Sequence, residues 1–300
     1  MIEPVETHQN NVFVLNSTIT KFSNLLTEIE VWRATGFDAM ELHGHKLEQF
    51  LNSGFSADDL RTALRGVPVV GVGFLKDIER QGSAREALLA EASRLFDLAS
   101  MVGAGGVQIL TGPVDVRLVL EHSRGRSAAG YTGILGRSED ELLALAAVNV
   151  AELADRAAQH GLHLYLEPLS WAPINGLKKS LRLIHMAGRP NVKIVIDYWH
   201  CFTSGVAPEE VAQLDEKLIY GVHVCDSLPF SGGIPIEDEL RDVPTGKGVL
   251  NLKEWTDAVK ATGYRGWWAA ETFSRNMQQQ SVSAVARDMR QLLGTLVGAS

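Results

Sequence analysis

Residues 163–169 read HLYLEPL and residues 193–200 read KIVIDYWH. Each stretch is an almost continuous apolar run that leads to an acidic residue. Continuous apolar runs, unlike alternating ones, are typical of parallel strands that are buried on both faces. The two stretches therefore predict strands of a parallel sheet with polar chemistry at their carboxyl ends.

Similar short apolar runs recur along the chain, and amphipathic helical patterns lie between them. The predicted strands are 13–16, 39–43, 69–75, 106–111, 163–169, 193–200, 220–226 and 266–273. Eight strand–helix repeats without a break in composition predict an α/β fold, a single (β/α)₈ TIM barrel over residues 1–300. A doubly wound parallel sheet is the alternative.

Several local patterns predict where helices begin and which face they bury. Ser83 with Glu86 and Ser138 with Glu141 have the spacing of capping boxes, and a last helix is predicted over 279–296. One helical face carries a set of apolar residues at the expected spacing, namely Phe22, Leu25, Leu26, Ile29 and Trp32. Two long connections, 112–137 and 227–248, follow carboxyl ends of predicted strands, where barrel active sites are built.

Composition excludes several classes of protein. The 300 residues carry a formal net charge of −8, which opposes binding to nucleic acid. No apolar run reaches about 18 residues, so a membrane-spanning helix is not expected. The start, MIEPVETHQNN, has no basic and apolar segments of a secretory signal. Two cysteines, Cys201 and Cys225, form no disulfide framework, so a reduced cytoplasmic protein is expected.

Four successive predicted strands end in side chains that bind metals. These are Glu167, Asp197, His223 and Glu271. In a closed barrel they would converge at the mouth, and buried carboxylates need a cation or several donors. Three carboxylates with one imidazole suit Mn²⁺, Mg²⁺ or Co²⁺, and Zn²⁺ stays open. Taken singly, each carboxylate could instead accept backbone N–H groups, and His223 could be a hydrogen-bonded core residue.

The series LEP, DYWH, HVCD and AET resembles the xylose isomerase-like barrel superfamily, which includes sugar phosphate isomerases and epimerases, dehydratases and endonuclease IV. The resemblance implies that Glu167, Asp197, His223 and Glu271 bind one divalent metal ion, usually a manganese-like one. It also implies that His200 contacts a substrate oxygen near that metal. Gly246-Lys247-Gly248 resembles the family's Gly-x-Gly turn, where Lys247 meets either the substrate or solvent.

Such a site would serve an isomerase or epimerase acting on a sugar or keto-polyol, phosphorylated, glycosidic or free. A divalent metal lowers the cost of an enediolate, and Glu167 and Glu271 could act as base and acid on opposite faces of the substrate. Loss of a β-substituent from the same species would give a lyase or dehydratase, which is the alternative. A further alternative is a non-catalytic barrel with a vestigial site, or a barrel that works only within a larger complex.

The sequence departs from three known subfamilies of this superfamily, and each departure argues against assigning the chain to that subfamily. Ketose 3-epimerases carry an extra Glu after the first ligand and an Arg after the ligand His, but those neighbourhoods here read PLSWAPI and CDSLPF. Dehydratases tend to have an extra His or Lys soon after the first glutamate, and Lys178 and Lys179 come late for that position. The endonuclease needs histidines at the ends of strands three and four, which here read GVGFL and VQILT.

Other side chains at strand ends are expected to bind substrate or to support the fold. Glu41, His43 and Gln108 could hydrogen-bond a polyol or have a structural role. Trp199 could form an apolar wall for a sugar ring or belong to the core. Arg241, in the connection after strand seven, could anchor a substrate or face solvent. Partners are expected to be a small-molecule sugar or keto-polyol and a second copy or partner subunit, not nucleic acid or membrane.

Overall fold

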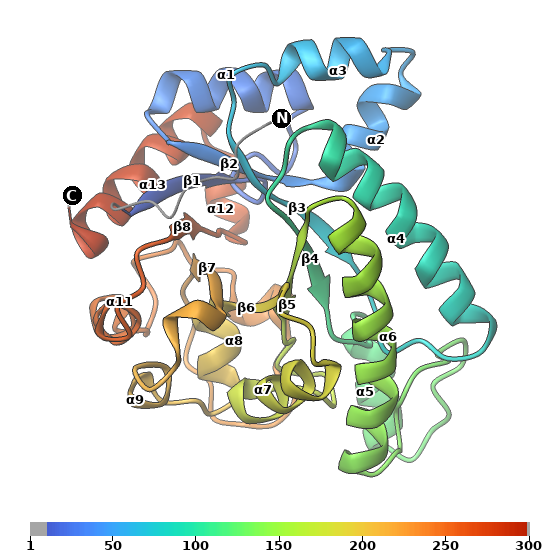
Figure 1. The fold of residues 1–300 in the computed structure, drawn as a ribbon. Helices are drawn as coiled ribbons and strands as arrows, with labels where there is room; N and C mark the ends of the chain where they lie inside the picture. The colour runs from blue at the N-terminus through green and yellow to red at the C-terminus, as the bar shows by residue number, and fades with distance from the viewer. Residues whose placement is uncertain (1–10, 299–300) are drawn as a thin grey trace.

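The computed structural model describes residues 11–298 and shows a closed barrel of eight parallel strands surrounded by helices (Figure 1). The predicted (β/α)₈ fold is confirmed. The strands are β1 (Val12–Asn16), β2 (Ala39–His43), β3 (Val69–Leu75), β4 (Gly106–Leu110), β5 (His163–Glu167), β6 (Val192–Asp197), β7 (Ile219–Val224) and β8 (Trp267–Ala270). The ring closes because β1 pairs in parallel with both β2 and β8.

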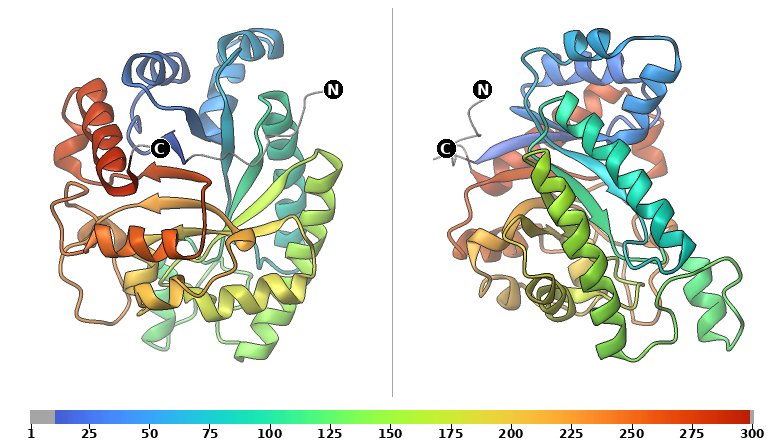
Figure 2. Two further views of the ribbon diagram at one scale, coloured as in Figure 1. Left: turned by 60° about the vertical axis from the view of Figure 1, so that its left-hand side comes forward. Right: turned by 45° about the vertical axis from the view of Figure 1, so that its right-hand side comes forward.

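Helices cover the outside of the ring and fill the connections between strands (Figure 2). They are α1 (Leu25–Thr35), α2 (Gly44–Asn52), α3 (Ala57–Ala63), α4 (Ser83–Met101), α5 (Val116–Ser123), α6 (Glu139–Gln159), α7 (Gly176–Ala187), α8 (Tyr198–Thr203), α9 (Pro208–Val211), α10 (Glu237–Leu240), α11 (Leu252–Ala261), α12 (Arg275–Gln278) and α13 (Val282–Val297), with a 3₁₀ turn at Glu216–Leu218. Both long connections thus contain a short helix, α5 in the first and α10 in the second.

Large aromatic side chains fill the inside of the barrel below the strand ends. Tyr165 and Tyr220 stack with ring centroids 4.7 Å apart, and Trp267 meets both rings edge-on. Glycine on the neighbouring strand makes room for them, since a Cβ on Gly221 would lie 2.0 Å from the Trp267 ring. The next residue, Trp268, is fully buried in the outer apolar layer, so the two tryptophans occupy opposite faces of β8. This packed floor supports the polar residues above it.

Three local expectations are wrong. Helix α1 begins only at Leu25, capped by Asn24, so Phe22 precedes it and is 72% exposed. Helix α4 begins at Ser83 itself with Gly82 as its N-cap, whereas the capping box of Ser138 and Glu141 is confirmed. His200 lies in α8 and not in a strand, because the Asp197 side chain accepts the His200 N–H and starts a helix there.

The polar start of the chain lies mostly outside the described residues, so the expectation about a secretory signal concerns residues 1–10 that the structure does not describe. Across residues 11–298, no helix has the length and apolar character needed to cross a bilayer. The last predicted helix, 279–296, corresponds to α13 at Val282–Val297, preceded by the short helix α12.

Candidate metal centre

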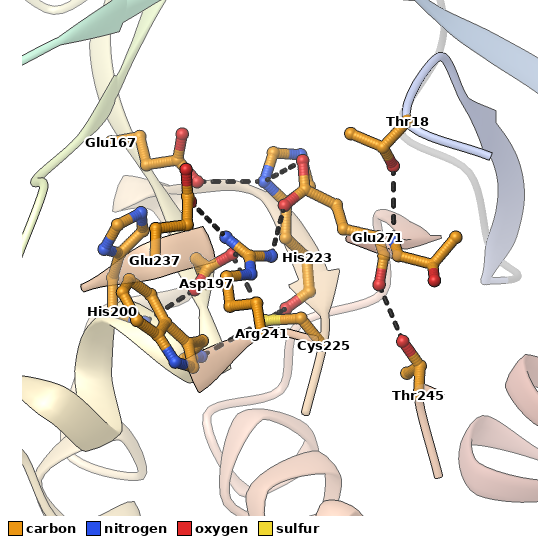
Figure 3. Close-up of polar contacts among 12 residues, drawn as sticks. Thr18, Glu167, Asp197, His200, His223, Cys225, Glu237, Arg241, Thr245 and Glu271 are labelled. Atoms are coloured by element: carbon orange, nitrogen blue, oxygen red, sulfur yellow. Dashed lines mark hydrogen bonds and ion pairs between the residues drawn. The ribbon is translucent and has the colours of Figure 1, made fainter. Parts of the chain in front are cut away.

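The four predicted ligands meet at the carboxyl ends of β5 to β8 (Figure 3). Each offers one donor atom, and these atoms lie within 4.8 Å of one another. Glu167 and Asp197 are the last residues of their strands, His223 lies in β7, and Glu271 follows β8 directly. Residues Asp197 and His223 are paired in register across β6 and β7. Parallel pairing therefore brings together residues that are far apart in sequence.

The imidazole of His223 lies between the Glu41 carboxylate on one side and the Glu167 and Glu271 carboxylates on the other. Its Nδ1 is 3.2 Å from Glu167 Oε1 and 3.5 Å from Glu271 Oε1, while Nε2 is 2.9 Å from Glu41 Oε2. A ligand histidine commonly donates its second N–H to a carboxylate, which orients the ring and fixes its tautomer. Glu41 is in that position, so Nδ1 is free to face a cation shared with Glu167 and Glu271.

Burial makes this cluster electrostatically unusual. The pKa of Glu167 is raised to about 8, chiefly by burial and also by the neighbouring Glu271 and Asp197 carboxylates, against the lowering effect of His223. Burial lowers the pKa of His223, but the carboxylates of Glu41, Glu271 and Glu167 outweigh burial and hold it well above its usual range. A divalent cation would relieve the repulsion among the carboxylates. The donor set of three carboxylates and one imidazole fits such an ion.

His200 lies beside this cluster and is buried. Its Nδ1 is 3.1 Å from the Ser170 backbone N and 3.3 Å from the Ser170 hydroxyl. Because the backbone N–H can only donate, Nδ1 accepts, and the neutral ring carries its proton on Nε2. Burial lowers the pKa of His200 to about 3. The ring therefore offers an N–H donor beside the predicted ligands.

Arg241 does not face solvent, because it is only 3% exposed. Its Nη2 lies 2.7 Å from Glu271 Oε2 and 3.5 Å from Asp197 Oδ2, and its Nη1 lies 3.1 Å from Glu237 Oε1 (Figure 3). The guanidinium carbon is 3.9 Å from the centre of the Phe273 ring. The connection between β7 and α11 thus delivers a fixed positive charge to the cluster.

The remaining predicted substrate residues have different surroundings. Gln108 Nε2 donates to Glu167 Oε2 at 2.8 Å, so it contacts a ligand. Trp199 is fully buried beside Arg241. His43 is half-buried at the end of β2, with its ring 5.4 Å from that of Phe74. Lys247 is exposed in the turn after α10 and is not among the residues of the cluster.

Three buried residues contact either a predicted ligand or Glu41 and were not predicted to belong to the site. Asn16 Nδ2 donates to Glu41 Oε2 at 2.7 Å and lies 3.4 Å from Glu271 Oε1. The Tyr165 hydroxyl donates to Glu41 Oε1 at 2.8 Å. The Cys225 thiol donates to Asp197 Oδ2 at 3.2 Å. In the sequence, position was the only signal for these three residues. Tyr165 and Cys225 lie two residues from a predicted ligand, and Asn16 is the last residue of β1.

Asp226 anchors the connection after β7 and is not part of the ligand cluster. Its Oδ2 accepts the N–H groups of Gly246 and Gly248 at 3.0 and 2.7 Å, and its Oδ1 accepts those of Ser227 and Leu250. A Cβ on Gly248 would lie 2.2 Å from Asp226 Oδ1, so the close approach requires glycine. The Gly-x-Gly turn therefore closes the base of the connection that carries Arg241.

Comparison with known proteins identifies the family and the fold of the chain. A sequence model described as xylose isomerase-like TIM barrel matches residues 29–294. The chain is 26% identical over 264 residues to an inosose isomerase of Bacillus velezensis, covering 86% of each protein. It is 27% identical over 283 residues to a 3-dehydroshikimate dehydratase of Pseudomonas aeruginosa, covering 92% of this chain but only 40% of the dehydratase.

A solved structure has the same fold. The crystal structure of an IOLI protein with a bound zinc atom superposes with a TM-score of 0.83, at 19% sequence identity, covering 95% of this chain and 98% of that one. At this identity the similarity concerns the fold alone. The chain is thus similar over most of its length to an isomerase and to a zinc-containing barrel, and it spans about 40% of the dehydratase.

Proposed function

The chain belongs to the xylose isomerase-like TIM barrel family, and from this premise we propose a divalent-metal-dependent isomerase or epimerase. Its substrate is a sugar or keto-polyol, which can carry a phosphate or a glycosidic group. The observation that carries the proposal is the convergence of four buried donor atoms within 4.8 Å, from the ends of four successive strands.

Glu167, Asp197, His223 and Glu271 would hold the metal. Mn²⁺ is proposed first, because an oxygen-rich site with one imidazole suits it, ahead of Mg²⁺, Co²⁺ and Zn²⁺. When bound, the metal supplies Lewis acidity that makes a proton next to a substrate carbonyl easier to remove. Glu41 is a positioning residue, since its bond to His223 Nε2 turns Nδ1 toward the other three ligands.

Proton transfer falls to Glu167 and Glu271. Their Oε1 atoms lie 3.2 and 3.5 Å from the same nitrogen, His223 Nδ1, and the two residues come from different strands, β5 and the end of β8. A substrate held next to the proposed metal would lie within reach of both carboxylates. One carboxylate takes the proton, and the other, already protonated, donates its own proton to the opposite face of the same carbon, which gives epimerisation. Donation to the neighbouring carbon, with the hydroxyl proton passing to the former carbonyl oxygen, gives isomerisation. The protons on both carboxylates exchange with solvent between turnovers.

His200 would contact a substrate oxygen. Its Nδ1 is occupied by the Ser170 N–H, so Nε2–H is the donor available to a substrate carbonyl or hydroxyl. A donor in this position stabilises negative charge that develops on the substrate oxygen. Trp199, His43, Gln108 and Lys247 remain proposed substrate contacts.

A lyase is the second candidate. The observation that favours it is the similarity to a 3-dehydroshikimate dehydratase. The same two carboxylates would remove a proton and protonate a departing β-hydroxyl, which leaves as water. A dehydrating enzyme would release an unsaturated product, whereas an isomerase or epimerase conserves the composition of its substrate.

The experiment is solvent exchange in D₂O with a panel of keto-sugars, keto-cyclitols and 3-keto-glycosides, followed by NMR. The proposal predicts deuterium at one carbon next to the carbonyl, and loss of exchange after Glu167→Gln or Glu271→Gln. The matched control is Glu30→Gln, an exposed residue of α1. Full exchange in both site variants, or none with metal-loaded wild-type protein across the panel, would contradict the proposal.

The cellular setting is part of the proposal. We propose a cytoplasmic protein whose residues 1–300 act as one domain and associate as a homo-oligomer or with a partner subunit. Both cysteines are unpaired and buried, which suits a reducing compartment. Light scattering of the purified protein tests the oligomeric state, and a monomer with full activity would overturn this part.

A further inference from the structure

Arg241 places a buried positive charge against the predicted metal ligands. Its side chain is 2% exposed, and its Nη2 lies 2.7 Å from Glu271 Oε2 and 3.5 Å from Asp197 Oδ2. In Figure 3 the guanidinium lies among Glu237, Asp197 and Glu271. Solvent screens a buried charge only weakly, so the charge of this guanidinium acts strongly on every neighbouring ion.

Arg241 and a metal ion would bind opposite sides of the same carboxylate. Glu271 Oε1 is the oxygen near His223 Nδ1 and thus near the other ligands, whereas Glu271 Oε2 accepts from Arg241. The two cations would therefore not need the same oxygen atom. They would repel each other across one carboxylate, which can neutralise only one positive charge.

The surroundings of Arg241 hold it in place. The guanidinium carbon is 3.9 Å from the centre of the Phe273 ring and 5.3 Å from that of Trp199. Glu237, one turn earlier in α10, accepts from Nη1 at 3.1 Å. The base of the same connection is closed by Asp226, which accepts four backbone N–H groups. A metal ion that enters the site would therefore meet a guanidinium that cannot easily leave.

We propose that Arg241 is the counter-cation of the metal-free site, which keeps that site folded and holds its metal affinity down. This inference rests on the metal site of the proposed function. Arg241 compensates the carboxylates when no metal is bound, and the same charge opposes a divalent ion when one arrives. A residue that only oriented Glu271 would have the opposite effect, because its removal would weaken metal binding.

The test is calorimetric titration of metal-free protein with Mn²⁺. Arg241→Met removes the charge and keeps much of the side-chain volume, and it is expected to bind Mn²⁺ about tenfold more tightly than wild type. Its metal-free unfolding temperature is expected to fall, and added Mn²⁺ should raise it by more than in wild type. Arg275→Met, at an exposed arginine paired with Asp242, is the matched control and should change neither quantity.

Two further variants separate charge from shape. Arg241→Lys keeps the charge and should stay within about threefold of the wild-type affinity, whereas Glu237→Gln leaves the arginine less compensated and should weaken binding about threefold. Weaker or unchanged binding by Arg241→Met overturns the inference. If that variant does not fold, unchanged or tighter binding by Glu237→Gln overturns it. Absence of Mn²⁺ binding by wild type would instead overturn the proposed function.

Discussion

The two halves of the barrel divide the work of the site. All four predicted ligands lie in β5 to β8 or directly after β8. Strands β1, β2 and β4 contribute Asn16, Glu41 and Gln108, which hydrogen-bond to these predicted ligands. The first half of the barrel thus supports the site, and the second half supplies the side chains that are predicted to bind the metal. The difference teaches that one half of a symmetrical fold can supply the side chains proposed to hold a metal while the other half orients them.

The division also has an electrostatic side. In the half that carries the four predicted ligands, the Glu271 and Asp197 carboxylates raise the pKa of the buried Glu167, a repulsion that a cation would relieve. In the support half, Glu41 has three donors to its two oxygens, from Asn16, Tyr165 and His223. Despite burial, His223 and these hydrogen bonds lower the pKa of Glu41. The support carboxylate is therefore already compensated, which suits an orienting role.

Removing a ligand should have the largest effect. Asp197→Ala is expected to weaken Mn²⁺ binding more than about 100-fold, because ligand loss should exceed the 10- to 100-fold cost of losing an outer partner. Metal content after dialysis against Mn²⁺ measures this. Asp197 also caps α8, so Asp115→Ala, which removes the cap of α5, controls for the loss of a cap. Equal metal content in both variants would contradict the proposal that the metal-binding side chains come from the second half of the barrel.

Removing a residue that orients a predicted ligand should have a smaller effect on Mn²⁺ affinity. Glu41→Gln leaves an oxygen that can accept from His223 Nε2 but removes the charge, so Mn²⁺ affinity should fall about tenfold. Calorimetric titration measures it, with the exposed Glu48→Gln of α2 as the control. A loss as large as that of Asp197→Ala would make Glu41 a ligand in its own right. No loss would remove its positioning role.

The smallest effect is expected in the support half, away from the metal centre. Glu79, in the connection after β3, is buried against the Tyr131 hydroxyl and the Gly112 N–H. Burial raises its pKa from 4.5 to about 7. Because the folded state binds the proton more tightly, this group's stabilising contribution is complete below pH 4.5 and is lost as pH rises through 7.

As the pH rises from 6 to 8, deprotonation of Glu79 should therefore lower the free energy of unfolding by about 1 kcal/mol. Metal-free protein unfolded in urea at both pH values measures this change, and the difference between wild type and Glu79→Gln isolates it from the titration of the ligands. The exposed Glu86→Gln serves as the control. An identical pH dependence in wild type and Glu79→Gln would show that Glu79 does not titrate in this range.

The sequence allowed two features to be predicted, the barrel and the convergence of Glu167, Asp197, His223 and Glu271 at its mouth, because both depend on patterns within single strands. Glu167 and Glu271 each follow an apolar run, and parallel strands bring such ends together. Asn16, Tyr165 and Cys225 were missed, since their contacts depend on the register between strands. The predicted strand through His200 failed because a side-chain cap on Asp197 starts α8 within an apolar run.

Phe22 shows the limit of periodicity in the same way. Its spacing fits the buried face of α1, but Asn24 caps the helix two residues later and leaves Phe22 exposed. Arg241 was predicted either to contact substrate or to face solvent, and its burial against Glu271 follows from the turn closed by Asp226. Contacts made by a long connection cannot be deduced from a strand pattern.

The most direct measurement is anomalous X-ray diffraction from crystals of the protein soaked in Mn²⁺. The account predicts one anomalous peak per chain, bounded by Glu167, Asp197, His223 and Glu271, with Glu41 on the far side of the imidazole. A peak at another site, or no peak among these four side chains at saturating Mn²⁺, would contradict it.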